Sequence, residues 1–209
     1  MLTIEKLIRT IADQAKAKYQ LKRIEIKKEW ENKGYEVYFA HELTQCSLKR
    51  RYETIFPELK ENISFKPRVM IGEMVESAVK SYLKLEGSDN YKVLEGKKKY
   101  AIFGGIDMYN PKSNAVFDIK YTTAEPVKRD HHELRVKLYN WLLDTDKGAL
   151  IYISPRGFKQ YLIREALTDK EVLELIEKPI APRYSGWECK YCMYSDICSF
   201  ATISKEERM

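Results

Sequence analysis

The sequence Gly104-Gly105-Ile106-Asp107 ends one predicted β-strand, and Val116-Phe117-Asp118-Ile119-Lys120 forms the next. The residues between them include Asn110-Pro111-Lys112-Ser113-Asn114, which is typical of a turn, so the two strands are expected to form a hairpin. Side chains alternate between the faces of a strand, which places Asp118 and Lys120 on the same face. Folding about residue 112 or 113 brings Asp107 opposite Asp118. The sequence therefore predicts two carboxylates and a lysine close together where the two strands meet.

This combination of side chains favours phosphodiester hydrolysis. Two carboxylates at close range repel each other unless a cation lies between them, and oxygen ligands select hard ions such as Mg2+ or Mn2+. A neighbouring lysine can orient or deprotonate the attacking water, or neutralise charge on the phosphate. The alternative is a surface ion pair between Asp118 and Lys120 on an edge hairpin.

Two predicted helices supply further candidate side chains. The helix over residues 67–86 carries an apolar stripe, and Glu76 lies at the edge of that stripe. A carboxylate that borders a buried face needs a partner, although a glutamate at such a boundary is often simply exposed. The helix from Val127 to about Asp144 places four side chains on neighbouring turns of one face: His131, Arg135, Tyr139 and Leu142.

The chain has four cysteines, three of which follow the pattern C-x2-C-x5-C: Cys189, Cys192 and Cys198. The fourth, Cys46, is expected in a helix from His41 to about Tyr52. Four soft ligands suit either a tetrahedral zinc site or an iron–sulfur cluster. A centre that used all four would enclose nearly every residue between 46 and 189. The basic run Lys49-Arg50-Arg51 follows Cys46 and indicates either a path for phosphates or an exposed helix end.

Composition limits the class of protein. The 209 residues are enough for one sizeable domain, and 44% hydrophobic with 33% charged residues is typical of a globular chain. A net charge of +6 is compatible with nucleic acid. No apolar run approaches the roughly 18 residues of a membrane span, and the first residues lead into an amphipathic helix, not a signal peptide. We therefore expect a cytoplasmic protein without a membrane partner, in which clustered cysteines bind metal in preference to forming disulfides.

The expected organisation is a single domain over 1–209 with three parts. Residues 1–52 form an N-terminal helical part that carries Cys46, residues 67–178 form the core, and residues 179–209 form the cysteine segment. Strands are expected over 91–120, 148–154 and 158–166, and residues 35–39 are expected to form a short strand or an extended arm. A capping-box pattern that begins at Thr168 predicts a last helix to about Lys178.

The two motif sets together resemble a known family. An acidic residue at the end of one strand followed by D-x-K on the next resembles the PD-(D/E)xK nuclease core. One early cysteine with a late C-x2-C-x5-C resembles the RecB-like nucleases that carry an iron–sulfur staple, and specifically the compact CRISPR-associated exonucleases. The resemblance covers roughly residues 40–200. It implies an α/β, restriction-endonuclease-like fold, in which a central mixed sheet is flanked by helices and held by a four-cysteine iron–sulfur staple.

The resemblance also implies roles for the residues that match. Asp107 and Asp118 would bind Mn2+ or Mg2+ together with the carbonyl of Ile119, and Lys120 would be the catalytic lysine. Given the nuclease motifs, the x5 spacing and the distant fourth ligand favour a [4Fe-4S] cluster with a structural role over zinc. Its ligands would be Cys46, Cys189, Cys192 and Cys198.

The implied activity is exonucleolytic cleavage of single-stranded DNA, or of DNA with single-stranded ends, during CRISPR spacer acquisition beside the CRISPR integrase complex. Endonuclease activity is left open. The alternatives are a catalytically weak iron–sulfur DNA-binding partner, or a related nuclease of repair or of a virus.

Two positions depart from the family pattern. The family's usual histidine, in a G-x-x-V-H context, is Glu76 here, and a glutamate can still bind Mg2+ or Mn2+ as a third carboxylate. The family's Q-x-x-x-Y keeps Tyr139 but has Arg135 in the glutamine position, where it would contact a phosphate or pair with a carboxylate. The residues expected along the DNA path are Lys49, Arg50, Arg51, His131, Arg135 and Tyr139. Trp187 or Tyr191 would stack on a base or pack around the cluster.

Overall fold

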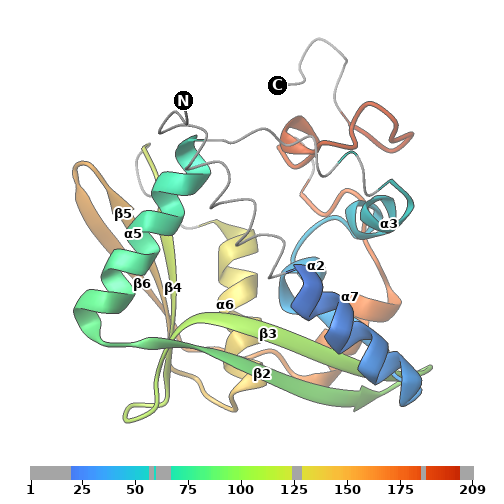
Figure 1. Cartoon of the computed structure of the whole chain (residues 1–209), viewed down its shortest axis with the longest axis horizontal. Helices are drawn as coiled ribbons and strands as arrows, with labels where there is room; N and C mark the ends of the chain where they lie inside the picture. Colours follow the sequence, from blue (N-terminus) through green and yellow to red (C-terminus); the bar gives the residue numbers. More distant parts are fainter. Residues whose placement is uncertain (1–19, 57–58, 60–66, 124–128, 185–186, 203–209) are drawn as a thin grey trace, which may run out of the picture.

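The computed structural model describes residues 20–56, 59, 67–123, 129–184 and 187–202, with backbone only for 67–70. Within this part, six strands form one mixed sheet flanked by helices (Figure 1). The strands are β1 (Glu36–Phe39), β2 (Glu86–Glu95), β3 (Lys99–Asn110), β4 (Ala115–Tyr121), β5 (Gly148–Ser154) and β6 (Gly157–Ile163). The helices are residues 20–32, α2 (Ala40–Leu43), α3 (Ser47–Ile55), α5 (Pro67–Leu83), α6 (Asp130–Leu142) and α7 (Asp169–Glu177). A short 3-10 turn, η1, covers Cys189–Tyr191.

The long strand β3 organises the sheet. It pairs with β2 along one edge, and its other edge pairs with β1 near its beginning and with β4 near its end. Beyond β4 follow β5, which is parallel to β4, and β6, which is antiparallel to β5. The strand order is therefore β1-β3-β4-β5-β6, with β2 on the far side of β3.

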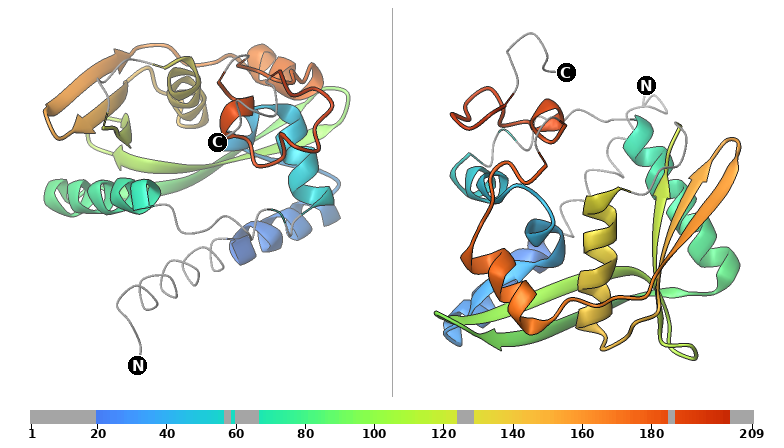
Figure 2. Two further views of the ribbon diagram at one scale, coloured as in Figure 1. Left: turned by 90° about the horizontal axis from the view of Figure 1, so that it is seen from above. Right: turned by 180° about the vertical axis from the view of Figure 1, so that it is seen from behind.

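Helices cover both faces of this sheet (Figure 2). The helices α6 and α7 lie on one face, while α5 and the helix over 20–32 lie on the other. The main core forms between the sheet and the first pair, where Ile102, Leu138 and Val172 are wholly buried. Burying aliphatic side chains of this size contributes about 1.5–3 kcal/mol each relative to exposure.

The capping box predicted at Thr168 is confirmed. The Thr168 hydroxyl accepts from the backbone N–H of Glu171, and the Glu171 carboxylate accepts from the backbone N–H of Thr168 at 2.7 Å. A cap of this kind satisfies backbone donors that the first turn of a helix leaves unpaired, and it fixes where α7 begins.

Residues 35–39, expected to form a short strand or an extended arm, contain strand β1, so the sheet extends outside 67–178. Two sequence expectations need correction. The helix expected from His41 to Tyr52 is broken into α2 and α3, and Cys46 precedes α3 instead of lying within a helix. The α5 helix ends at Leu83, three residues before the end predicted at residue 86. The strand β2 already begins at Glu86. Residues 1–19 of the predicted N-terminal helix lie outside the described residues.

Candidate active site

The predicted carboxylates and lysine meet on strands β3 and β4. The Lys120 ammonium lies 2.8 Å from an oxygen of Asp118 and 3.4 Å from an oxygen of Asp107, and it donates to the carbonyl of Ile119 at 3.0 Å. Asp118 is completely buried, whereas the side chains of Asp107 and Lys120 are about one-fifth exposed. The convergence that the hairpin pattern predicted is therefore present, and one edge of the group is open to solvent.

A β-bulge turns Asp107 toward this group. Ile102 and Ile106 belong to the core beneath α6, and Gly104 contacts Leu142 of that helix, so even-numbered residues of β3 face α6. The register of β2 against β3 then shifts between Ser88–Ile106 and Glu86–Tyr109, where β3 has one extra residue. After the shift Tyr109 packs against the same core, so the odd-numbered residues face α6. A bulge reverses the alternation of a strand in this way and so brings Asp107 to the face that holds Asp118.

Gly87 of β2 lies directly opposite the bulge. A Cβ atom at this position would stand 2.9 Å from the carbonyl oxygen of Ile106 and 3.3 Å from that of Asp107. Any side chain there would push the backbone that carries Asp107. The bulge and its facing glycine were not predicted from the sequence, although a glycine inside a strand pattern is a known signal for such an irregularity.

The electrostatics of the two aspartates differ. Burial, together with the negative charges of Asp118 and Glu76, raises the pKa of Asp107 to about 7 against the opposing effect of Lys120. Burial alone would also raise the pKa of Asp118, but the cationic Lys120 and Arg135 outweigh burial and hold this pKa below its usual value. The pair thus favours a nearby positive charge, because two ionised carboxylates at this depth repel each other.

The helices contribute one carboxylate and one guanidinium to the surroundings. Glu76 of α5 forms an ion pair with Lys80 at 2.5 Å, and its charge acts on Asp107. Arg135 of α6 is partly buried, and the negative charge of Asp118 raises the pKa of its guanidinium against the effect of burial. The charge of Arg135 therefore acts on Asp118 from α6, and the contact of Arg135 with a phosphate stays a prediction.

The four cysteines lie together at the other end of the molecule. Cys46, which precedes α3, and Cys189, Cys192 and Cys198 from the last segment all line one cavity of about 20 Å³. All four are free thiols, and burial raises the pKa of Cys46 and of Cys192. In the described part of the chain, no three Cys, His, Asp or Glu side chains are grouped tightly enough to hold a metal ion as they stand. The four cysteines therefore come from two segments far apart in sequence and share one cavity.

A search with protein-family models found no match to this chain. Among curated proteins, the CRISPR-associated exonuclease Cas4 of Saccharolobus solfataricus is 30% identical over 174 residues, which cover 77% of this chain and 86% of that protein. The chain belongs to the Cas4 family. This assignment confirms the family resemblance drawn from the two motif sets.

A solved structure agrees with the Cas4 assignment. The crystal structure of SSO0001 overlays with a TM-score of 0.74 at 28% identity, covering 80% of this chain and 88% of that one. Together with the mixed sheet flanked by helices, it supports the restriction-endonuclease-like core expected from the sequence. A phage-related exonuclease from Haemophilus somnus 129PT overlays at a TM-score of 0.44 with 14% identity, covering 70% and 91% of the two chains, which is too distant to carry an argument.

Several side chains expected along the DNA path of this Cas4 chain are engaged inside the protein. Tyr139 is only 4% exposed and packs in the core, so the structure does not place it where it would touch a strand. Burial, with the nearby charge of Arg135, lowers the pKa of His131 to about 4, so His131 is uncharged at neutral pH. The ring centroids of His131 and Trp187 lie 4.6 Å apart, which favours a packing role for this tryptophan over base stacking. Tyr191, by contrast, is 63% exposed.

The basic run after Cys46 is divided among different contacts. Arg50 lies over the ring of Tyr38 at 3.8 Å and donates to the carbonyl of Val37, so it is held within the fold. Lys49 donates to Gln45 at 2.9 Å and lines the cysteine cavity. Arg51 is exposed and remains the member best placed to meet a phosphate.

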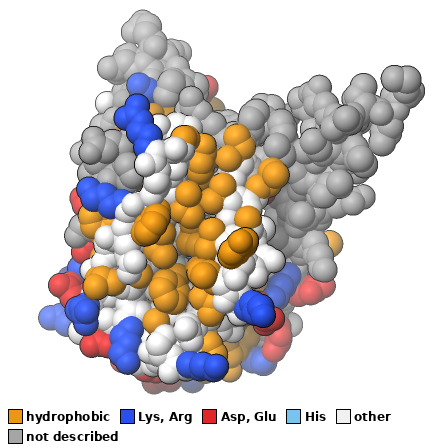
Figure 3. Space-filling view, turned by 90° about the vertical axis from the view of Figure 1, so that its left-hand side faces the viewer, with side chains coloured by type: hydrophobic (Ala, Val, Ile, Leu, Met, Phe, Trp, Pro, Cys, Tyr) orange, Lys and Arg blue, Asp and Glu red, His pale blue; other side chains and the backbone are white. Residues whose placement is uncertain are grey.

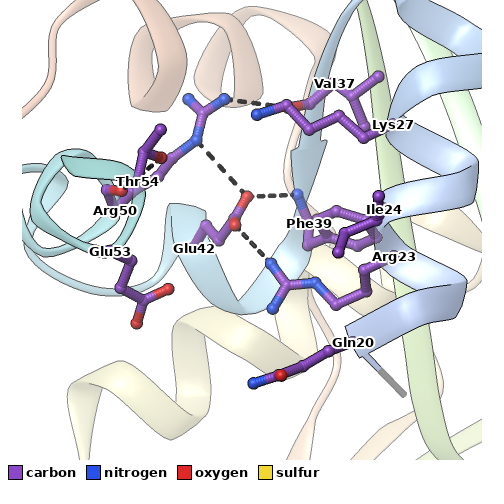
Figure 4. Close-up of a pocket in the computed structure, with 10 residues that line it drawn as sticks. All are labelled: Gln20, Arg23, Ile24, Lys27, Val37, Phe39, Glu42, Arg50, Glu53 and Thr54. Carbon is purple, nitrogen blue, oxygen red and sulfur yellow. Dashed lines mark hydrogen bonds and ion pairs between the residues drawn. The ribbon is translucent and has the colours of Figure 1, made fainter. Parts of the chain in front are cut away.

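A separate pocket of about 250 Å³ lies between the helix over 20–32 and α3 (Figure 4). Glu42 occupies its centre, where it pairs with Arg23 at 2.5 Å and with Arg50 at 3.6 Å and accepts from the backbone N–H of Phe39. Its arginines are thus neutralised by a shared carboxylate, and none of Asp107, Asp118 and Lys120 lines it. This pocket is therefore not the candidate active site.

One organising residue of the cysteine region was missed. Glu188 is buried, and its carboxylate accepts from the backbone N–H of Cys46 at 2.5 Å and from those of Arg183 and Tyr184 at 2.9 and 3.1 Å. This side chain joins the loop before α3 to the last segment. A glutamate directly beside a metal-ligand motif was the available signal, but nothing local in the sequence identifies its distant partner.

Proposed function

We propose that this Cas4 chain is a Mn2+- or Mg2+-dependent exonuclease that cleaves single-stranded DNA, or DNA with single-stranded ends, and trims DNA ends during CRISPR spacer acquisition. The observation that carries the proposal is the position of Lys120 between Asp107 and Asp118, on two strands and open to solvent on one side. The homologous exonuclease supports the nuclease activity. The single-strand preference and the link to acquisition rest on the family resemblance.

The donor set fits a hard divalent ion. The Oδ2 atom of Asp118 is buried and has no hydrogen-bond partner among the described residues, which is a costly state for a carboxylate oxygen unless a cation binds there. Asp107 and the carbonyl of Ile119 lie beside the same lysine and would complete an oxygen set typical of Mg2+ or Mn2+. Glu76 would add a third carboxylate.

Each side chain then has a separate role. A bound divalent ion supplies an activated water and a positive charge beside the phosphate. Asp118 is held ionised by Lys120 and Arg135, so it is ready to bind a cation. Lys120 carries a positive charge that can be directed to the scissile phosphate, where it stabilises the negative charge that develops during attack. Arg135 acts on Asp118 through its positive charge and is a positioning residue in this scheme.

The cysteine cavity is proposed to hold a [4Fe-4S] cluster with a structural role. The C-x2-C-x5-C spacing with a distant fourth cysteine, beside the nuclease motifs, supports this assignment, and the four cysteines line one cavity. Iron–sulfur clusters are held by four thiolates in this manner. Iron and sulfide analysis of anaerobically purified protein tests the assignment, and a colourless, zinc-loaded protein without iron would refute it.

A catalytically weak DNA-binding protein is the competing function. Glu76 is paired with Lys80, and the charge of Arg135 is opposed by that of Asp118, so both departures from the family pattern have interactions that do not require chemistry. Such a protein would bind DNA in a salt-sensitive manner but would not cleave it.

The test is digestion of end-labelled single-stranded DNA in the presence of Mn2+. The parent should shorten the strand, whereas Asp118→Asn and Lys120→Ala should be slower by at least about 100-fold, since each loses a charge at the reacting phosphate. The matched control is Lys112→Ala, because Lys112 lies in the exposed hairpin turn and has the same charge. If the parent binds DNA without cutting it, or if both variants cut at the parental rate, the proposed active site is wrong.

The role in CRISPR adaptation needs a separate test, because a repair or viral nuclease would use the same chemistry. Pull-down with the full chain should recover the CRISPR integrase proteins. Nuclease activity without that association would assign the chain to a pathway outside CRISPR.

A further inference from the structure

An apolar surface covers the side of the molecule formed by α5 and the β5–β6 hairpin (Figure 3). On α5, helical spacing places exposed apolar side chains in one stripe, made up of Ile71, Met74, Ala78 and Tyr82. On β6, Phe158 is 77% exposed and Leu162 is 58% exposed. The partly exposed Ile151 and Ile153 of β5 belong to the same face of the sheet. Contiguous apolar surfaces of this kind mark sites of protein association.

The strand β6 also has a free edge. Among the described residues it pairs with β5 only, so its outer edge meets no other strand. Ser154 and Gly157 close a hairpin with a two-residue loop, and the closing pair of such a hairpin exchanges hydrogen bonds. Alternation along the ladder then turns the backbone N–H and C=O groups of Phe158, Gln160 and Leu162 away from β5. These three residues present unpaired donors and acceptors beside the apolar surface.

Another strand that pairs along one edge only, β2, shows the contrast. In the described part of the chain β2 pairs with β3 alone, but it carries four charged residues: Glu86, Asp89, Lys92 and Glu95. Charges along an edge oppose the addition of another strand, whereas β6 has one charged residue, Lys159. The exposed edge of β6 therefore lacks the protection that β2 has.

The sequence of β6 is complementary to itself under a two-fold axis at Gln160. Gln160 is the middle residue of Gly157–Ile163, so an antiparallel pairing about it uses the whole strand. Phe158 of each copy then lies opposite Leu162 of the other, on the apolar face. The residue on the axis is neutral, and Lys159 lies opposite Tyr161 of the other copy. An axis shifted by one residue to Lys159 would instead place two like charges opposite each other, which is destabilising.

We propose that β6 is an interface with a second copy of this chain, in which β6 pairs antiparallel with β6 about Gln160 and joins the two sheets. The pairing forms about six backbone hydrogen bonds. Gln160 pairs with Gln160 of the other copy, Phe158 of each copy pairs with Leu162 of the other, and each of these three pairs exchanges two hydrogen bonds. It also buries Phe158 and Leu162, which are exposed in one copy. An isologous two-fold contact is the commonest form of association for identical chains. The candidate active site lies on the α6 face of β3 and β4, so the interface leaves it open.

The full chain should sediment as a dimer and dissociate on dilution. Gln160→Pro removes one outward N–H without removing a hydrogen bond to β5, because the outward N–H of Gln160 is not used in that ladder. It should raise the dissociation constant at least about 100-fold, and Phe158→Glu should do the same by placing a charge in the apolar contact. Val93→Glu is the matched control, since Val93 is an exposed apolar residue on the other edge strand. This control should remain dimeric.

The register is tested by a charge swap. Phe158→Lys and Leu162→Glu should each weaken the dimer, and the double variant should recover part of the loss because each lysine then lies opposite a glutamate. Nuclease activity on single-stranded DNA should be retained by the Gln160→Pro monomer. A parent that stays monomeric at high concentration, or a dimer that Gln160→Pro and Phe158→Glu leave intact, would overturn the proposal.

Discussion

At the scale of single residues, the chemistry of the site depends on how neighbouring charges shift the ionisation of each carboxylate. Asp118 lies between two cations and is ionised, whereas Asp107, beside Asp118 and Glu76, has its pKa raised to about 7. The hairpin sequence predicted which side chains meet, because strand alternation is a local property. It did not predict their ionisation, which depends on Arg135 and Glu76 from two helices.

Replacing Glu76 tests whether a third carboxylate helps to bind the metal. Glu76→Ala should raise the Mn2+ concentration for half-maximal cleavage by about tenfold or more, because outer and inner ligands of a metal commonly contribute that much. Glu73→Ala, on an exposed position of the same helix, should leave the requirement unchanged. If both variants need the same Mn2+ concentration, Glu76 does not bind the metal and only forms the ion pair with Lys80.

The stability of the protein should depend on pH through His132. Burial, together with the neighbouring His131, lowers the pKa of His132 from 6.5 to about 3. Below pH 6.5 the unfolded chain therefore binds a proton that the native state does not bind until about pH 3. The free energy of unfolding should fall by about 1.4 kcal/mol per pH unit from this group as the pH drops through that window.

Urea unfolding of the parent and of His132→Gln measures this slope. The variant loses the hydrogen bond to the Tyr152 hydroxyl at every pH, but its stability should fall less steeply than that of the parent on acidification. Parallel curves for the two proteins would show that His132 is not held neutral.

At the scale of secondary-structure elements, the bulge in β3 decides which face Asp107 occupies. Local sequence signals are few here: Gly104-Gly105 precedes Asp107, but the glycine that permits the bulge is Gly87 on the neighbouring strand. The partner strand therefore positions the carboxylate as much as its own strand does. Sequence periodicity alone cannot predict a register shift that depends on both strands.

Gly87→Ala should displace the bulge and reduce cleavage by about 100-fold, since a shift of about 1 Å in a reacting group is enough for such a loss. Its Cβ would lie 2.9 Å from the Ile106 carbonyl oxygen, so the backbone has to move. Gly105→Ala is the matched control, because a Cβ there makes only an ordinary contact at 3.6 Å with Asp89. Equal activities for the two alanine variants would show that the bulge does not position Asp107.

At the scale of the whole molecule, the cysteine segment is tied both to α3 and to the helix that carries Arg135. Glu188 binds the backbone of Cys46, and Trp187 packs on His131 of α6. The last segment therefore bridges parts of the chain that are far apart in sequence. In the part of the chain that the structure describes, no helix is long and apolar enough to cross a membrane.

Losing one cysteine should loosen this bridge. Cys192→Ser should reduce bound iron and lower the thermal midpoint by about 10 °C or more, because metal binding contributes directly to folding and a few kcal/mol shift the midpoint of a chain this size by that amount. Ser199→Ala, an exposed position beside Cys198, serves as the control. Unchanged iron content and midpoint in Cys192→Ser would show that this cysteine is not a ligand.

The sequence by itself determined the features that depend on neighbouring residues. These include the alternation that joins Asp118 and Lys120, the turn between β3 and β4, the cap of α7 and the spacing of the three late cysteines. The tertiary structure alone decided the features that depend on packing between distant segments: the entry of β1 into the sheet, the bulge opposite Gly87, the burial of Tyr139, and the link from Glu188 to Cys46. The physical reason is that backbone periodicity fixes the face of a side chain, whereas its charge, exposure and partners are fixed only when the elements pack.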